Sequence, residues 1–124
     1  CTSHPDHMLA YQQADICLDP CPHGGGVVGI EQLYMGVPLL TLYGTQPSGR
    51  SASSVLTQMG RTEWIAKTPA EFIEKAVEWS EKPKELAAAR QTLRNELLES
   101  PVVKGYVEAV EQRYREIWES YVNS

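Results

Sequence analysis

Residues 24–31, Gly-Gly-Gly-Val-Val-Gly-Ile-Glu, decide the fold, because they place a run of glycines between a short apolar strand and a helix. Glycines let a backbone approach phosphate oxygens, and the free N–H groups and positive dipole end of a helix favour an anion. We expect Glu31 in the first turn of that helix, where it can accept hydrogen bonds from ribose hydroxyls. The pattern is typical of a nucleotide diphosphate site, although a tight strand-to-helix turn without a ligand would use the same glycines.

The composition is that of a soluble globular protein. The chain has 124 residues, of which 42% are hydrophobic and 22% charged, enough for one domain with a buried core. Its net charge is -5, and no Lys/Arg cluster is present, which argues against a nucleic-acid interface. The sequence contains neither an apolar run of about eighteen residues nor a signal-peptide pattern, so we expect no membrane contact and a cytoplasmic location.

Three cysteines, Cys1, Cys17 and Cys21, make an odd number in a chain that does not need disulfides, so we interpret them as free thiols. A zinc site that also uses His23 can be imagined, but the C-x3-C spacing matches no common ligand pattern. We therefore expect no metal.

The chain begins at Cys1 without a methionine and enters a motif almost at once, which indicates a piece of a longer protein.

The first half of the chain alternates helices and strands. A helix is predicted over residues 6–13, and an apolar strand over 15–19 is ended by prolines. The glycine turn then opens a helix that ends at Gly36. Further elements are predicted as a strand at 37–43, a loop at 44–49, a helix at 51–59 and a strand at 63–66. Mostly apolar strands separated by helices predict a parallel sheet.

The second half is predicted to be helical. Thr68, Pro69 and Glu71 form a capping box with proline at the first helical position. The buried stripe of this helix is predicted as Phe72, Ile73, Ala76 and Val77. The next helix, residues 83–99, has its apolar face at Leu86, Ala89, Leu93 and Leu97, with Arg90 at the flank. A last helix follows Val102, and we expect its apolar stripe to pack on a core; the stripe contains Val103, Val107, Val110, Tyr114, Ile117, Trp118 and Tyr121.

The glycines satisfy G-x-G-x-x-G at residues 24, 26 and 29, so a dinucleotide-binding domain must be considered. That fold requires an acidic residue about twenty positions further on, but there is no Asp or Glu between Glu31 and Glu63. A Walker A motif is excluded because no Gly-Lys-Ser/Thr follows. An acid on the helix that holds the diphosphate is instead the arrangement of nucleotide-sugar transferases with the GT-B architecture.

Ordered motifs extend this interpretation over nearly the whole chain. They are DICLD at 15–19, the glycine turn, EQLYMGVP at 31–38, LTLYG at 40–44, GRS at 49–51, ASSVL at 52–56, WIA at 64–66, LR at 93–94, SP at 100–101 and YREIW at 114–118. In this order the chain resembles the donor domain of the O-GlcNAc transferase and SPINDLY family. The fold implied is α/β: a Rossmann-like partial parallel sheet of about three short strands with a C-terminal helical tail, half of a GT-B nucleotide-sugar domain.

The resemblance implies an inverting, metal-free enzyme that transfers a sugar, expected to be N-acetylglucosamine from UDP-GlcNAc, to Ser or Thr of proteins. Residues 1–124 would be a single domain, the C-terminal part of the donor-binding domain. The catalytic residues, a first Rossmann-like domain and helical repeats of about 34 residues would lie upstream, and the isolated chain would be inactive. The donor base, uridine or guanosine, stays open.

Site residues follow by position from the resemblance. His7 resembles the histidine against the nucleotide base and diphosphate, and Glu31 the ribose-binding acid. Gly26, Val27 and Val28 resemble the segment whose backbone N–H groups meet the diphosphate. Gly25 and Gly29 complete the predicted donor site. We expect Arg50 to order its loop through a carbonyl or carboxylate oxygen instead of touching a ligand.

Two departures from the family leave alternatives open. Threonines usually stand where this chain has Val27 and Val28, and a lysine usually precedes the histidine, where the nearest equivalents here are His4 and Thr2. These departures favour a degenerate interaction domain of the same fold as the second hypothesis. Another GT-B transferase or a nucleotide-sugar epimerase is the third.

Overall fold

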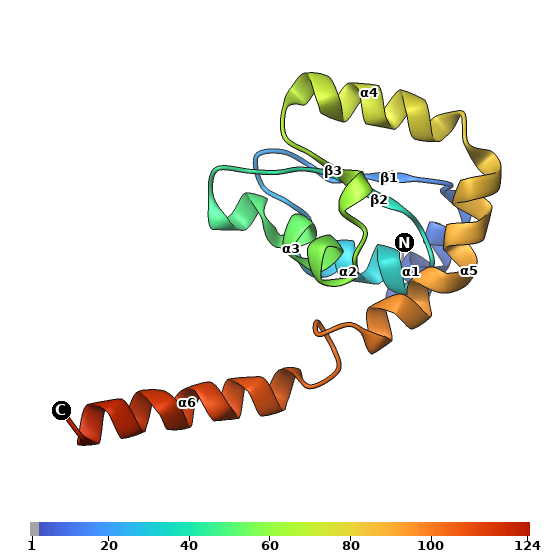
Figure 1. Cartoon of the computed structure of the whole chain (residues 1–124). Helices are drawn as coiled ribbons and strands as arrows, with labels where there is room; N and C mark the ends of the chain where they lie inside the picture. Colours follow the sequence, from blue (N-terminus) through green and yellow to red (C-terminus); the bar gives the residue numbers. More distant parts are fainter. Residues whose placement is uncertain (1–2) are drawn as a thin grey trace.

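The computed structural model describes residues 3–124 and contains a three-stranded parallel sheet in the order β1-β2-β3 (Figure 1). β1 (Cys17–Leu18) pairs with β2 (Leu39–Leu42), with Cys17 opposite Leu39. β2 pairs with β3 (Ile65–Ala66), with Thr41 opposite Ile65. The predicted α/β class with three short parallel strands is confirmed, although each strand is shorter than its apolar run.

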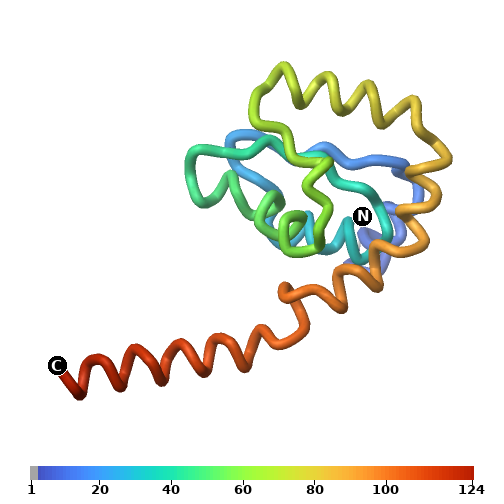
Figure 2. Tube along the Cα trace, in the orientation of Figure 1, coloured from blue at the N-terminus to red at the C-terminus, as the bar shows by residue number. Residues whose placement is uncertain are grey.

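Helices cover both faces of this sheet, with α4 on one side and α2 and α3 on the other (Figures 1 and 2). α5 runs along the flank and joins the two layers. The α-helices are α1 (His4–Ala10), α2 (Val27–Tyr34), α3 (Ser51–Gln58), α4 (Pro69–Ser80), α5 (Pro83–Glu99) and α6 (Tyr106–Val122). Short 3-10 turns are η1 (Tyr11–Gln13), η2 (Pro47–Gly49) and η3 (Thr62–Trp64). The predicted helix at 6–13 is thus α1, which begins earlier, followed by η1.

The core lies among the sheet, α2, α3 and α5. Its fully buried members are Leu33, Leu39, Leu40, Leu56, Trp64, Leu93 and Leu97. The predicted apolar face of α5 is confirmed, since Leu86, Ala89, Leu93 and Leu97 are all buried. α5 also holds the chain before β1 and the end of α2, because Arg90 donates to the carbonyl oxygen of Ala14 and Arg94 to that of Tyr34.

The start of α4 is as predicted, but its buried stripe is not. Thr68 Oγ1 accepts a hydrogen bond from the N–H of Glu71, which confirms the cap. The Glu71 carboxylate, however, accepts from Lys67 N–H and not from Thr68. The prediction that Ile73 and Val77 are buried is wrong, since they are 64% and 55% exposed. The other two members of the predicted stripe, Phe72 and Ala76, do pack against the core, and Trp79 joins them.

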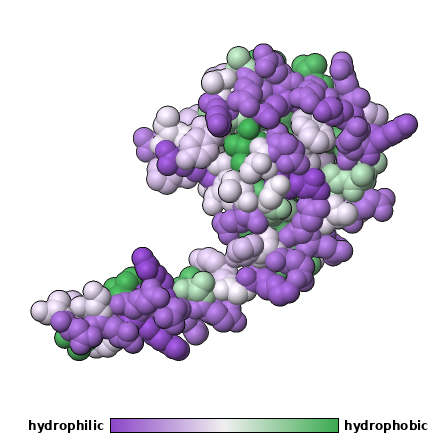
Figure 3. All heavy atoms as spheres, in the orientation of Figure 1, coloured by the Kyte–Doolittle hydropathy of each residue, from purple (hydrophilic) through white to green (hydrophobic). Residues whose placement is uncertain are grey.

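The last helix, α6, projects away from the α/β body (Figures 1 and 2). None of its residues is buried, so the prediction that its apolar stripe packs on a core is wrong for the described residues of this chain. Apolar residues lie on the surface of the projecting arm in Figure 3, and Tyr114, Ile117, Trp118 and Tyr121 are each more than half exposed. The helix starts at Tyr106, after Gly105 in the left-handed region. No helix among residues 3–124 is long and apolar enough to cross a membrane.

Candidate functional site

The glycine turn follows β1 and leads directly into α2. Gly26 precedes the helix with φ 52° and ψ -117°, a conformation that side chains with a Cβ rarely adopt. No heavy atom lies within 4 Å of the position that a Cβ on Gly26 would take, so the backbone angle alone requires the glycine. Because of this angle, the chain reverses sharply at the N-terminus of α2.

Most backbone N–H groups of the turn already have acceptors. Gly24 N–H donates to the carbonyl of Ser48, and Gly25 N–H donates to Asp19 Oδ1. Within the helix start, Val28 and Gly29 donate to the carbonyls of Gly25 and Gly26. In the described part of the chain, no acceptor is found for the N–H groups of Gly26 and Val27. These two groups therefore lie at the positive end of α2 and can receive an anion.

Glu31 lies on α2 and faces two histidines of α1. Its Oε1 is 3.1 Å from His4 Nε2 and its Oε2 is 3.5 Å from His7 Nε2. The prediction that Glu31 belongs to the first helical turn is wrong, because α2 starts at Val27 and its first turn contains no acid. Side chains on a helix lean toward its N-terminus, so the carboxylate still lies on the glycine-turn side of α2.

His7 stands between Glu31 and Tyr11. Its Nε2 is 2.9 Å from Tyr11 Oη, and the two rings meet edge to face at 5.0 Å. Burial, with smaller contributions from the charges of Glu31 and Cys17, raises the pKa of Tyr11, so its hydroxyl stays protonated and can donate. A neutral His7 can accept this bond at Nε2; a protonated His7 directs the same nitrogen to Glu31.

The remaining predicted donor-site residues differ in exposure. The side chains of Val27 and Val28 reach the surface, being 70% and 41% exposed, and they contribute no hydroxyl. Gly29 is buried, and a Cβ on it would lie 3.2 Å from Leu39 Cδ2. Its visible role is to let α2 pack closely on β2.

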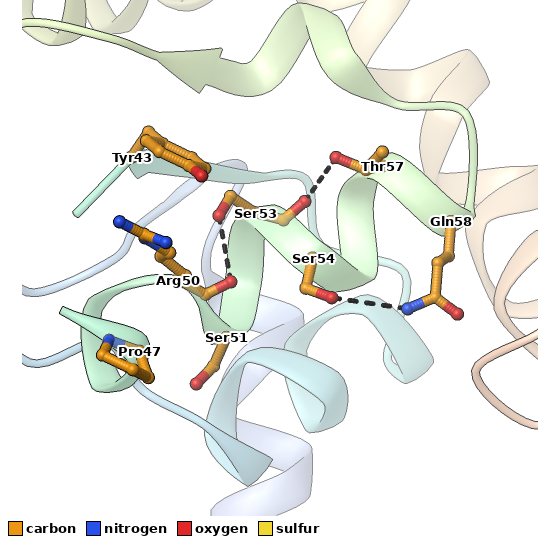
Figure 4. A pocket seen from close by; sticks show the side chains of 8 residues that line it. All are labelled: Tyr43, Pro47, Arg50, Ser51, Ser53, Ser54, Thr57 and Gln58. Carbon is orange, nitrogen blue, oxygen red and sulfur yellow. Dashed lines mark hydrogen bonds between the residues drawn. The ribbon is translucent and has the colours of Figure 1, made fainter. Parts of the chain in front are cut away.

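The expectation that Arg50 orders its loop is confirmed. Its Nε donates to the carbonyl of Gly44 and its Nη2 to that of Thr45, both at 2.8 Å, and the guanidinium lies over the Tyr43 ring. Arg50 lines a groove of roughly 530 Å³. Figure 4 shows its side chain next to that of Tyr43. The other lining residues are Pro47, Ser51, Ser53, Ser54, Thr57 and Gln58. None belongs to the glycine turn, and Ser53 and Thr57 already donate to carbonyls of their own helix.

The thiols of Cys17 and Cys21 are free, as predicted, while Cys1 lies outside the described residues. Among residues 3–124, no group of three or more His, Cys, Asp or Glu side chains is placed to hold a metal ion. Burial raises the pKa of the Cys17 thiol, against the opposing charge of Arg90, so this thiol is protonated near neutral pH.

Sequence reasoning missed two polar residues that support the turn. Asp19, only 7% exposed, accepts from Gly25 N–H at 2.7 Å and from Thr41 Oγ1 at 2.8 Å. The sequence pattern identifies Asp19 and Thr41 only as parts of apolar strands. A carboxylate at the end of a buried strand, shortly before glycines, was the available signal for this role.

Comparisons with known proteins match the same architecture. The family model described as Glycosyl transferase family 41 matches residues 1–110. A barley (Hordeum vulgare) protein named probable UDP-N-acetylglucosamine--peptide N-acetylglucosaminyltransferase SPINDLY is 36% identical over 94% of this chain and 12% of its own length. The Caenorhabditis elegans UDP-N-acetylglucosamine--peptide N-acetylglucosaminyltransferase is 30% identical over 94% of this chain and 10% of its own length.

A solved structure agrees with these relatives. A mutant of Thermobaculum terrenum O-GlcNAc transferase matches with a TM-score of 0.87 and 31% identity, over 96% of this chain and 23% of that one. The expected resemblance and the GT-B architecture are thereby confirmed. The chain spans only about an eighth of the length of the SPINDLY relatives that it matches. On the match over residues 1–110, this chain belongs to glycosyl transferase family 41.

Proposed function

We propose that this chain forms the nucleotide-sugar donor site of a transferase that moves N-acetylglucosamine from UDP-GlcNAc to Ser or Thr hydroxyls of proteins. Family membership and the names of the relatives support the general reaction. The observation that carries the donor-binding role is that Glu31 of α2 meets His7, while the N-terminus of the same helix has two N–H groups without acceptors among residues 3–124. In this arrangement Glu31 accepts from ribose hydroxyls, while the Gly26 and Val27 N–H groups bind the diphosphate.

These groups perform one half of an inverting transfer. The reaction breaks the bond between the sugar and the diphosphate, so negative charge grows on the leaving phosphate oxygen. The dipole of α2, the two N–H groups and a protonated His7 stabilise that charge. The second half, alignment and deprotonation of the acceptor hydroxyl, is assigned to residues upstream in a longer polypeptide. We therefore expect the 124-residue chain alone to bind donor but not to transfer sugar.

The first test is a titration of this chain with UDP and with GDP, followed by amide NMR shifts. We expect saturable shifts at His7 and at residues 24–31 with one of the two nucleotides, which identifies the base. Glu31→Ala should weaken binding, while Glu74→Ala, which removes an acid from α4, should leave it unchanged. If millimolar nucleotide leaves every shift unchanged, the donor-binding role of this chain is wrong.

One observation favours a second candidate, a non-catalytic interaction domain of the same fold. Val27 and Val28 place apolar side chains on the surface at the mouth of the turn, where family members usually have threonines. Absence of nucleotide binding in the titration would favour this candidate. The family match does not support a nucleotide-sugar epimerase.

A further inference from the structure

Asp19 is a buried carboxylate without an ion pair among residues 3–124. It is 7% exposed and stands directly after β1. Its Oδ1 accepts from the N–H of Gly25, and its Oδ2 accepts from the hydroxyl of Thr41, which is fully buried on β2. Burying a charge raises the free energy of the folded state unless hydrogen bonds satisfy it. The bonds to Gly25 and Thr41 therefore offset the cost of burying Asp19.

The glycine turn fits closely around this carboxylate. A Cβ on Gly24 would lie 2.9 Å from Asp19 Oδ2, closer than real Cβ contacts permit. A Cβ on Gly25 would lie 3.4 Å from Asp19 Oδ1. Gly24 therefore serves the approach of the backbone to Asp19, whereas Gly26 serves the reversal of the chain; at Gly25 a Cβ would make an ordinary contact with the carboxylate.

The bond to Asp19 also decides which N–H groups are left for a ligand. The carboxylate occupies Gly25 N–H, and the carbonyls of Ser48, Gly25 and Gly26 occupy the N–H groups of Gly24, Val28 and Gly29. What remains is the adjacent pair Gly26 and Val27. Their direction depends on the backbone angles of the turn, and Asp19 ties that turn to β1 and β2.

We propose that Asp19 is the positioning residue of the donor site: with Thr41 it holds the glycine turn so that the N–H groups of Gly26 and Val27 face the diphosphate. This inference rests on the proposed donor-binding function. Asp19 does not touch the ligand. It acts through its bond to Gly25, and its bond to Thr41 fixes its own position at the end of the sheet.

The sign of one substitution separates positioning from simple electrostatics. A carboxylate near a diphosphate repels it, so if charge alone mattered, Asp19→Asn would raise the affinity for UDP. If Asp19 positions the turn, the same substitution weakens binding, because an amide is a weaker acceptor for Gly25 N–H and presents an NH₂ group toward Thr41. Thr41→Val removes one of the two bonds without changing the charge.

The experiment measures dissociation constants of UDP and UMP for the wild-type chain and for Asp19→Asn, Asp19→Ala and Thr41→Val. We expect Asp19→Ala to weaken UDP binding by about tenfold and the two milder variants by about threefold. UMP, which lacks the second phosphate, should lose less than UDP in each variant. The matched control is Ser100→Ala, which removes another buried side-chain hydrogen bond, to the carbonyl of Leu97, far along the chain.

Each outcome is decisive. UDP binding by the wild-type chain with unchanged or increased affinity in folded Asp19→Asn and Thr41→Val overturns the positioning role and leaves the donor site intact. Equal losses for UDP and UMP overturn it too, since they indicate general damage to the site. If the wild-type chain binds neither UDP nor GDP, the proposed donor site fails and this inference fails with it; if it binds GDP alone, the same variants are titrated with GDP and GMP. Should Asp19→Ala not fold, the two conservative variants carry the test.

Discussion

Individual atoms at the start of α2 decide what this site can bind. Glu31 lies in the second turn of the helix and still meets His4 and His7, because α1 presents these two side chains three residues apart on one face. His7 Nε2 serves two neighbours, Tyr11 and Glu31, and cannot accept from one and donate to the other at once. Glu31 keeps a second contact with α1 through His4 Nε2, at 3.1 Å, whichever neighbour His7 serves.

Gly26 offers a test with a matched control. Gly26 and Gly60 both have positive φ, and both have open space where a Cβ would lie. Gly26→Ala and Gly60→Ala should each destabilise the fold by about 1 kcal/mol, because the strain comes from the backbone alone. Only Gly26→Ala should weaken nucleotide binding. Urea unfolding and UDP titration of both variants check this, and equal binding losses would contradict a role for Gly26 in the site.

The site could be predicted only where a local sequence pattern indicates the chemistry of a residue. Glycines before a helix and an acid upon it indicated the turn and Glu31, and the family motifs indicated His7. The roles of Asp19 and Thr41 were not predicted, because the sequence of an apolar strand does not indicate which residue its polar side chain will contact. The acceptors of Gly24 and Gly25 N–H come from residues outside the motif, so no local pattern contains them.

Helices and strands were predictable to the extent that their boundaries have local causes. Thr68 with Pro69 marks the start of α4 correctly, and Pro83 and Ser100 mark the start and the end of α5. The stripe of α4 was not predictable in the same way. Both Ile73 and Phe72 continue a helical periodicity, and only the position of the sheet decides that Phe72 faces it.

A fork of hydrogen bonds ties η3 to α5. Arg61 donates from Nε and Nη2 to the two carboxylate oxygens of Glu96, both at 2.7 Å, and this lowers the pKa of Glu96. Because the pKa of Glu96 is lower in the folded chain than in the unfolded chain, the ion pair stabilises the fold fully at pH values above the ordinary glutamate pKa, near 4. This contribution is lost as the pH falls through the pKa of folded Glu96.

Glu96→Gln should accordingly cost about 1 kcal/mol at pH 7, discounted for the partial exposure of the pair. The difference from wild type should shrink as the pH falls below 4. Denaturant unfolding at several pH values measures it. Glu99→Gln on the same helix is the control, because the pair of Glu99 with Lys104 is largely exposed and should contribute nothing measurable. A pH-independent loss in Glu96→Gln would contradict the ion-pair explanation.

The molecule as a whole divides into a covered body and an uncovered arm. The α/β body buries Trp64 and most of its leucines, whereas α6 leaves Tyr114, Ile117, Trp118 and Tyr121 in solvent. Exposed apolar patches of this kind tend to associate. The periodicity of α6 predicted the helix and its stripe correctly, but it contains no information on what lies opposite the stripe.

The isolated chain should therefore self-associate through α6 as its concentration rises. Replacing Ile117 and Trp118 together by glutamine should keep the chain monomeric at concentrations where the wild type forms dimers or larger species. Arg113→Gln with Glu119→Gln, changed on the charged face, is the matched control and should associate like wild type. Sedimentation velocity over a range of concentrations measures this, and a wild-type chain that stays monomeric throughout would contradict the prediction.

Gly105 has a mechanical consequence for this arm. The 17 residues of α6 form a rigid rod of about 25 Å, joined to the body at a residue with φ 77° and no neighbour within 4 Å of its Cβ position. A rotation of roughly ten degrees at that joint swings the far end by about 4 Å, given the length of the rod. The direction of α6 relative to the body therefore depends on the torsion angles of Gly105, since none of the helix's residues is buried against the described chain.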